Sequence, residues 1–352
     1  MPTDPITSDP APSDPITGDP LPVPGMPDAK ITALLSQGTY VLLAVILSAL
    51  AIATLVGLIL SRRQSQSIES ALVLRFNRKL RVWWTMAAIL LIGFLLHRVG
   101  VVVIFFLVSF WALREFISMT PTRRGDHRTL FWIFFIFTPL QYILIGLGGR
   151  SYDYFSIMIP VYASLFIPAR AAISGDFKRF LERSAKIQFG LLICVYALSH
   201  APALLDLSLV RTNGMVWKGS NASLLVFFVL IAQLSLVFER SWGKLAGRHV
   251  IAEKINGSRT WEGVIGSMVT TGLVAAALFW ATPFYPWEAG LMGAVVTVMA
   301  SAGTLTMSAI KRDRGVNDTG TLVQGHAGVL DQIDNICFAA PIFYHVTRFF
   351  FT

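Results

Sequence analysis

The chain has 352 residues, of which 54% are hydrophobic and only 14% are charged. Soluble proteins usually carry about 25% charged residues, so this composition excludes an ordinary soluble domain and predicts a protein built for lipid. The formal net charge of +9 would suit nucleic acid, unless the cations are sorted among loops between apolar segments.

Residues 1–38 are predicted to form a disordered tail. Pro and Asp are concentrated in residues 1–29, where the tetrapeptide DPIT at 4–7 is repeated at 14–17. A segment with so few apolar side chains cannot bury a core. It is not expected to be a signal peptide, because it lacks a basic start and the apolar run begins too late.

Ten apolar runs follow, and each is predicted to be a transmembrane helix. They lie at about 40–60, 82–96, 99–113, 129–147, 154–168, 187–205, 222–238, 264–283, 289–310 and 336–351. A helix needs roughly 20 residues to cross the hydrocarbon. Several runs are shorter, so eight or nine spans is the alternative, and 82–113 could be a tight hairpin. The predicted fold is all-α: a polytopic integral membrane protein with about ten transmembrane helices, in an N-terminal region at 39–220 and a C-terminal region at 221–352.

The cations alternate between the two sides of this predicted membrane protein. Most of the 29 Lys and Arg residues lie in the loops 61–81, 114–128, 169–186, 239–263 and 311–335. The positive-inside rule makes these loops cytoplasmic and places both termini on the other side. Topology therefore explains the basic charge, so nucleic-acid binding is not expected, whereas anionic membrane lipids suit these loops. The predicted location is the cell membrane, and a homo-oligomer is left open.

Two acid–base pairs stand at ends of predicted helices. Arg114 and Glu115 follow the third apolar run, within the pentapeptide ALREF. Glu239 and Arg240 follow the seventh. Charged pairs at such boundaries are expected to anchor a helix at the interface, with their side chains snorkelling towards water.

The first polar stretch of the C-terminal region is Gly243–Gly263, GKLAGRHVIAEKINGSRTWEG. Lys254, Arg259 and the nearby backbone could hold the phosphates of a nucleotide, because basic groups and exposed N–H groups both suit phosphate oxygens. The alternative is a basic loop beside the membrane.

The second polar stretch, Ser308–Asp334, joins two apolar runs and concentrates reactive residue types. Its charged residues and histidine, in chain order, include Lys311, Arg312, Asp318, His326, Asp331 and Asp334. Basic residues suit phosphate, and clustered carboxylates suit a hard cation such as magnesium. If the chain is helical from Leu330, Asp331 and Asp334 lie at i and i+3 and face the same way. Phosphates, a metal and a membrane together indicate a lipid phosphotransfer enzyme.

The order and spacing of these residues resemble the phosphatidate cytidylyltransferase (CDP-diacylglycerol synthase) family. That family carries Ser-x-apolar-Lys-Arg-x4-Lys-Asp, then Pro-Gly-His-Gly-Gly, then Asp-Arg-x-Asp. The matching residues here are Ser308, Lys311, Arg312, Asp318, Gly325, His326, Gly328, Asp331 and Asp334. The departures are Asn317, Gln324, Ala327 and Gln332.

The first polar stretch and ALREF also resemble motifs of this family. Gly243, Lys244, Gly247, Arg248, Lys254, Thr260, Glu262 and Gly263 match, whereas Glu253, Asn256, Gly257 and Arg259 depart, although Arg259 keeps the charge. The family also has an Asp seven residues before the glycine that matches Gly243, where this chain has Leu236. Gln233 and Glu239 lie on the same helix face as Leu236, and either could compensate.

The resemblance implies that CTP and phosphatidic acid react to give CDP-diacylglycerol and pyrophosphate, in phospholipid biosynthesis. It makes 221–352 the catalytic region and magnesium the cofactor. The implied catalytic residues are Lys311, Arg312, Asp318, His326 and Asp331. Phosphate binding falls to Lys254, Arg259, Lys311 and Arg312, and metal binding to Asp318, Asp331 and Asp334.

Three alternatives remain open. Leu236, Asn317 and Gln332 also suit a catalytically weakened member of the family that binds nucleotide or lipid. A CTP-dependent enzyme acting on another lipid is the second alternative. A transporter is the third, although transport would favour charges in the middle of several spans, and few are found.

Overall fold

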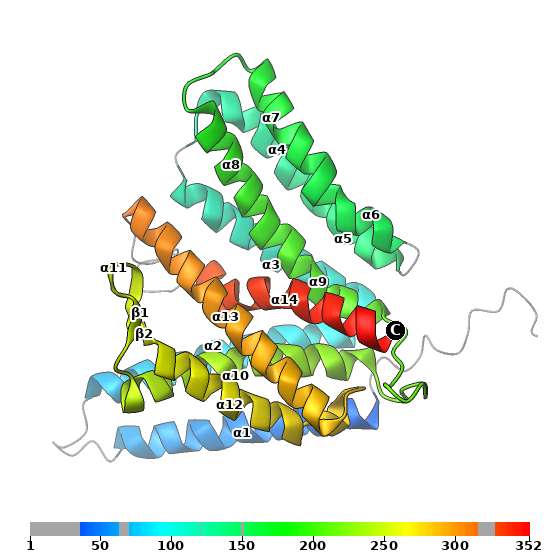
Figure 1. Cartoon of the computed structure of the whole chain (residues 1–352), viewed down its shortest axis with the longest axis vertical. Helices are drawn as coiled ribbons and strands as arrows, with labels where there is room; N and C mark the ends of the chain where they lie inside the picture. Colours follow the sequence, from blue (N-terminus) through cyan, green and yellow to red (C-terminus); the bar gives the residue numbers. More distant parts are fainter. Residues whose placement is uncertain (1–35, 63–69, 121, 149–150, 316–327) are drawn as a thin grey trace, which may run out of the picture. The chain divides into compact units, whose positions relative to one another are not determined.

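The computed structural model describes residues 36–62, 70–120, 122–148, 151–315 and 328–352. Nearly all of these residues are helical, and Figure 1 follows them from α1 in blue to α14 in red. The first helix begins at Gln37, just inside the predicted tail, and residues 1–35 lie outside the described part. Asp318 and His326 lie outside it as well.

The N-terminal region opens with three long helices, α1 (Gln37–Arg62), α2 (Ser70–Leu95) and α3 (His97–Met119). The chain turns between α2 and α3 at His97, whose φ is +60°, and the two helices pack against each other. The predicted tight hairpin at 82–113 is therefore present.

Three composite helical segments complete this region. The segment Arg124–Leu147 contains η2 (Arg124–Asp126), α4 (His127–Trp132), η3 (Ile133–Phe137) and α5 (Thr138–Leu147). The segment Tyr152–Ile173 contains α6 (Tyr152–Ile157), η5 (Met158–Ala163) and α7 (Ser164–Ile173). The segment Phe180–Asp206 contains α8 (Phe180–Leu191), η6 (Leu192–Ala197), α9 (Leu198–Ala203) and η7 (Leu204–Asp206). Each contains a π-helical stretch, where the hydrogen-bond ladder widens by one residue.

The C-terminal region consists of four helices and a small hairpin. The helices are α10 (Asn221–Ala246), α12 (Trp261–Ala277), α13 (Pro286–Arg314) and α14 (Leu330–Phe351), with the short η8 (Phe279–Ala281) after α12. Between α10 and α12, the strands β1 (Val250–Ala252) and β2 (Gly257–Thr260) pair antiparallel with Val250 opposite Thr260. The four-residue helix α11 (Glu253–Asn256) connects them.

The protein is an all-α polytopic membrane protein. Every predicted apolar run lies mainly within one helix or composite segment, and in the described part seven are long and apolar enough to cross a membrane. The helix α12 is shorter, at 17 residues. The remaining two, α2 and α14, carry several charged residues in their first halves, which lower their mean hydropathy.

Helices α10, α12 and α13 pack together, and α14 packs on α10, α13 and α9. The ring centroid of Phe343 on α14 lies 4.9–6.4 Å from the ring centroids of Phe227, Phe228 and Phe284. Glycines bring α12 and α13 close, since a Cβ at Gly293 would lie 2.6 Å from the Cβ of Ala275. Such small residues allow close packing in a membrane, where the hydrophobic effect does not drive helices together.

Candidate active site

The last turns of α13 meet the first turns of α14, and the predicted acid and base side chains pair there. The ammonium of Lys311 forms an ion pair with the carboxylate of Asp331. These side chains are only 17% and 10% exposed. The close crossing depends on Gly303, because a Cβ there would lie 2.7 Å from the backbone oxygen of Asp334.

Asp334 lies one turn beyond Asp331 and is buried. The helix begins at Leu330, so the expectation that both carboxylates share one face is confirmed. The Asp334 carboxylate accepts a hydrogen bond of 2.7 Å from the backbone N–H of Asn335. It also lies within electrostatic range of Asp331, Arg259 and Lys311, so charges from three elements converge here.

A second buried ion pair joins α10 to β2. The guanidinium of Arg259 lies 2.6 Å from the Glu239 carboxylate, and these side chains are 4% and 2% exposed. The Ser301 hydroxyl on α13 donates a 2.8 Å hydrogen bond to the same carboxylate. The expectation that Glu239 forms a snorkelling pair with Arg240 is therefore wrong, because α13 and β2 cover the acid and supply its partners.

Leu236 is buried on α10 and contributes an apolar side chain where the resembling family has an acid. Glu239, three residues further along, is the buried carboxylate that α10 contributes instead. Gln233 is engaged elsewhere, because its amide donates a 3.1 Å hydrogen bond to the backbone oxygen of Gln332. Both residues named as substitutes for the missing acid thus contact neighbouring elements of the site.

The hairpin rests on the end of α13. The Arg312 guanidinium donates to the backbone oxygen of Ile255 at 3.3 Å, and the Asn256 amide donates to the Ser308 hydroxyl at 3.1 Å. Lys254, on α11 within the hairpin, is exposed. The first polar stretch is thereby held beside the described start of the second.

The base of the hairpin is fixed by Glu262, in the first turn of α12. Its carboxylate accepts hydrogen bonds from the backbone N–H groups of Arg248 and His249 at 3.1–3.2 Å, and contacts the His249 ring at 2.5 Å. The His249 side chain and these backbone groups stabilise the ionised form and lower the pKa of Glu262 to about 2. Glu262 is therefore ionised near neutral pH, and its carboxylate can hold the base of the hairpin through these hydrogen bonds.

Two further cations lie near this site, and neither was among the predicted site residues. Lys79 on α2 lies within electrostatic range of Arg240 and Arg259, and Arg240 within range of Asp334. Neither belongs to a recognisable motif: Arg240 was considered only as the partner of Glu239, and Lys79 lies well inside α2. Arg240 therefore adds positive charge near Asp334 and Glu239, and Lys79 lies near the two arginines.

Glu115 is also part of this neighbourhood, and its predicted role as an interfacial anchor is wrong. It is buried, whereas Arg114 is exposed and stacks over Trp111 with its guanidinium carbon 5.0 Å from the ring centroid. The two side chains thus have different environments. The Glu115 carboxylate reaches α14 instead, where it accepts hydrogen bonds from the backbone N–H groups of Val329 and Leu330.

The donor chemistry at the start of α14 fits magnesium. Asp331 and Asp334 supply carboxylate oxygens, which this ion prefers. Asn335, the next residue, has a buried amide oxygen without a hydrogen-bond partner in the described part of the chain. No three His, Cys, Asp or Glu side chains among the described residues gather closely enough to hold a metal, and the third predicted ligand, Asp318, lies outside them.

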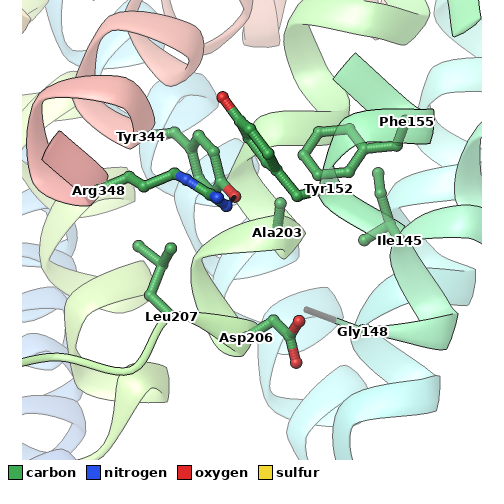
Figure 2. A pocket seen from close by; sticks show the side chains of 9 residues that line it. All are labelled: Ile145, Gly148, Tyr152, Phe155, Ala203, Asp206, Leu207, Tyr344 and Arg348. Atoms are coloured by element: carbon green, nitrogen blue, oxygen red, sulfur yellow. Dashed lines mark hydrogen bonds between the residues drawn. The ribbon is translucent and has the colours of Figure 1, made fainter. Parts of the chain in front are cut away.

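A separate cavity of about 30 Å³ lies between α5, α6, α9 and the C-terminal half of α14. Figure 2 shows Tyr152, Tyr344 and Arg348 along its wall, with Asp206 opposite them. The Arg348 guanidinium stacks on the Tyr152 ring. This volume holds about one water molecule, and no predicted site residue lines it. It is therefore not the candidate active site.

Comparisons with known proteins agree with the motifs. The sequence model of the cytidylyltransferase family matches residues 77–350. Uncharacterized protein YnbB of Escherichia coli K12 is 31% identical over 310 residues, which cover 87% of this chain and 97% of that protein. Phosphatidate cytidylyltransferases of Mycobacterium leprae and Haemophilus influenzae are each 35% identical, over 33% and 29% of this chain. Those matches span 38% and 37% of the two enzymes.

Proposed function

The chain belongs to the cytidylyltransferase family, and from this we propose that it transfers the cytidylyl group of CTP to phosphatidic acid. The products are CDP-diacylglycerol and pyrophosphate. The observation that carries the proposal is the meeting of Lys311, Asp331 and Asp334 where α13 and α14 cross, since it joins a cation to two carboxylates beside apolar helices.

In this reaction an oxygen of the lipid phosphate attacks the α-phosphorus of CTP. The bond from that phosphorus to the oxygen bridging the α- and β-phosphates breaks, and pyrophosphate leaves with the bonding electrons. Both reactants are anionic and repel each other, so catalysis depends on positioning and on nearby positive charge. Lys311, Arg312 and Lys254 are the proposed cations for the triphosphate and the leaving pyrophosphate.

Asp331 and Asp334, together with Asp318, are the proposed ligands of magnesium. When bound, the ion neutralises phosphate charge and fixes the orientation of the phosphates. The Lys311–Asp331 ion pair places a cation beside this carboxylate in partly buried surroundings, where the charge of a phosphate is also proposed to lie. His326 is proposed to bind phosphate or to move a proton. Asp318 and His326 keep these roles from the sequence motif alone.

Arg259 has a different proposed task from the other basic residues. Its charge is matched by Glu239 within the protein, so it contributes little net attraction for a nucleotide. Its proposed contribution is to hold β2, and with it the hairpin that carries Lys254, against α10. Lys254, which is exposed on the hairpin, is the proposed phosphate contact of this stretch.

The polar stretches at 239–263 and 311–335 are proposed to face the cytoplasm, in the cell membrane. CTP is a cytoplasmic metabolite, and both stretches are rich in Lys and Arg. Phosphatidic acid would reach the site from the bilayer through the apolar helices around it.

The direct test supplies purified full-length protein with radiolabelled CTP, phosphatidic acid and magnesium. Labelled CDP-diacylglycerol is expected, together with one pyrophosphate per lipid product. Absence of product under saturating substrates would contradict the proposal. A protein that binds CTP without turnover would be the catalytically weakened relative that Leu236 suggests.

A second candidate function is cytidylyl transfer to a different phosphorylated lipid. Two observations favour it: Leu236 replaces the family acid, and the named phosphatidate enzymes match over less than two fifths of their length. Competing equal amounts of several phosphorylated lipids in one reaction separates the candidates, because the preferred acceptor gives the dominant labelled product.

A further inference from the structure

The helix that carries Asp331 and Asp334 begins against a carboxylate from the other half of the chain. Glu115, near the end of α3, accepts a 3.0 Å hydrogen bond from the Val329 N–H and a 2.8 Å hydrogen bond from the Leu330 N–H. These residues lie 214 and 215 positions away in sequence. The Trp111 ring N–H donates to the same carboxylate at 3.1 Å.

This arrangement is a helix cap supplied from a distance. The first N–H groups of a helix lack partners within it, and they carry a partial positive charge. Val329 precedes the helix and has no polar side chain, so it cannot cap locally. Glu115 takes that place by accepting two hydrogen bonds from the start of α14. Together with the bond from Trp111, they compensate the cost of burying a carboxylate that is only 6% exposed.

The cap also fixes the geometry of the acids that follow. Asp331 is the next residue after Leu330, and Asp334 lies one turn further along the same face. A shift or fraying of the first turn would move the Asp331 carboxylate relative to Lys311. The Val329 and Leu330 N–H groups lie at the start of α14, so their hydrogen bonds to Glu115 hold the position of its first turn.

We propose that Glu115 is a positioning residue that orients Asp331 and Asp334 for the metal, and this rests on the proposed function. It does not touch the reacting atoms. Its carboxylate holds the first turn of α14, so the N-terminal region controls the metal affinity of the C-terminal region. Removing such a supporting group typically lowers metal affinity by about 10–100-fold. We therefore expect the loss of the Glu115 carboxylate to lower the metal affinity of this site about tenfold or more.

The chain offers a matched control on α13. Glu288 is also a buried carboxylate at a helix start, and it accepts hydrogen bonds from the Tyr285 N–H at 2.7 Å and the Thr212 hydroxyl at 2.6 Å. Lys311 lies near the other end of this 29-residue helix, which is about 44 Å long. Glu288→Gln therefore removes a comparable cap far from the proposed metal ligands.

The experiment compares wild type, Glu115→Gln and Glu288→Gln as full-length protein in detergent. Mn²⁺ is the probe for the magnesium site, and its free concentration is measured by electron paramagnetic resonance without substrates. Hydrogen exchange of the peptide covering Val329 to Asp334 reports the cap directly. We expect Glu115→Gln to weaken Mn²⁺ binding about tenfold or more and to speed exchange in that peptide, whereas Glu288→Gln leaves both near wild type.

A conservative variant guards against failure to fold. Glu115→Asp keeps the charge but shortens the side chain, so its Mn²⁺ affinity should lie between those of wild type and Glu115→Gln. The proposal is overturned if wild type binds no Mn²⁺, or if the Glu115 variants bind it as wild type does. Equal losses in Glu115→Gln and Glu288→Gln would overturn it too. If Mn²⁺ binding and hydrogen exchange change as expected but the wild type does not turn over CTP, only the proposed function is contradicted.

Discussion

Replacing Glu239 by Gln tests whether the buried ion pair with Arg259 holds the hairpin to α10. The substitution keeps the size of the side chain and an oxygen for the Ser301 hydroxyl, but it removes the charge. Arg259 is then left with an unpaired charge at 4% exposure. Breaking a buried pair on one side typically costs 3–5 kcal/mol, so a loss of about 3–5 kcal/mol in the free energy of unfolding is expected.

The assay is unfolding of the detergent-solubilised protein, followed by circular dichroism. The control is Glu182→Gln, which breaks the exposed i,i+4 ion pair with Lys186 and should leave the unfolding midpoint close to wild type. The double variant Glu239→Leu with Arg259→Leu removes both charges and should recover much of the lost stability. A Glu239→Gln variant that unfolds with the same free energy as the wild type would refute the reasoning, because the Glu239–Arg259 ion pair would then contribute nothing to stability.

Four other predictions follow from the same region. Asp331→Asn should leave the protein folded but lower turnover at least about a hundredfold, comparable to removing one transition-state donor, and a steady-state assay with radiolabelled CTP measures it. Leu236→Asp should not raise turnover in that assay, because α10 already contributes Glu239; an idle wild type with an active variant would contradict this. Gly303→Ala should lower the free energy of unfolding by about 1–3 kcal/mol, since its Cβ meets a backbone oxygen of α14 2.7 Å away, and thermal unfolding checks it. A Cys at Gly257 should resist an impermeant reagent applied to intact cells, and efficient labelling would reverse the proposed orientation.

The sequence alone was sufficient for the features that depend on local chemistry. The apolar runs located the helices, because a long apolar stretch has few stable alternatives in a membrane. The spacing of Asp331 and Asp334 predicted one shared helix face, since three residues make almost one turn. The motifs also identified the family, because they record chemistry in consecutive residues. The catalytic, phosphate-binding and metal-binding roles of the candidate site residues remain predictions.

The tertiary structure decided the partners of the buried polar groups. Glu115 and Glu239 each looked like half of a snorkelling pair with the adjacent arginine, because sequence places those charges side by side. In the folded chain Glu115 caps α14, 214 residues away, and Glu239 pairs with Arg259 beneath Ser301. Burial depends on which helices cross at a residue, and that is set by packing across the whole chain. A buried charge then takes the partner that the crossing brings near, which no local pattern specifies.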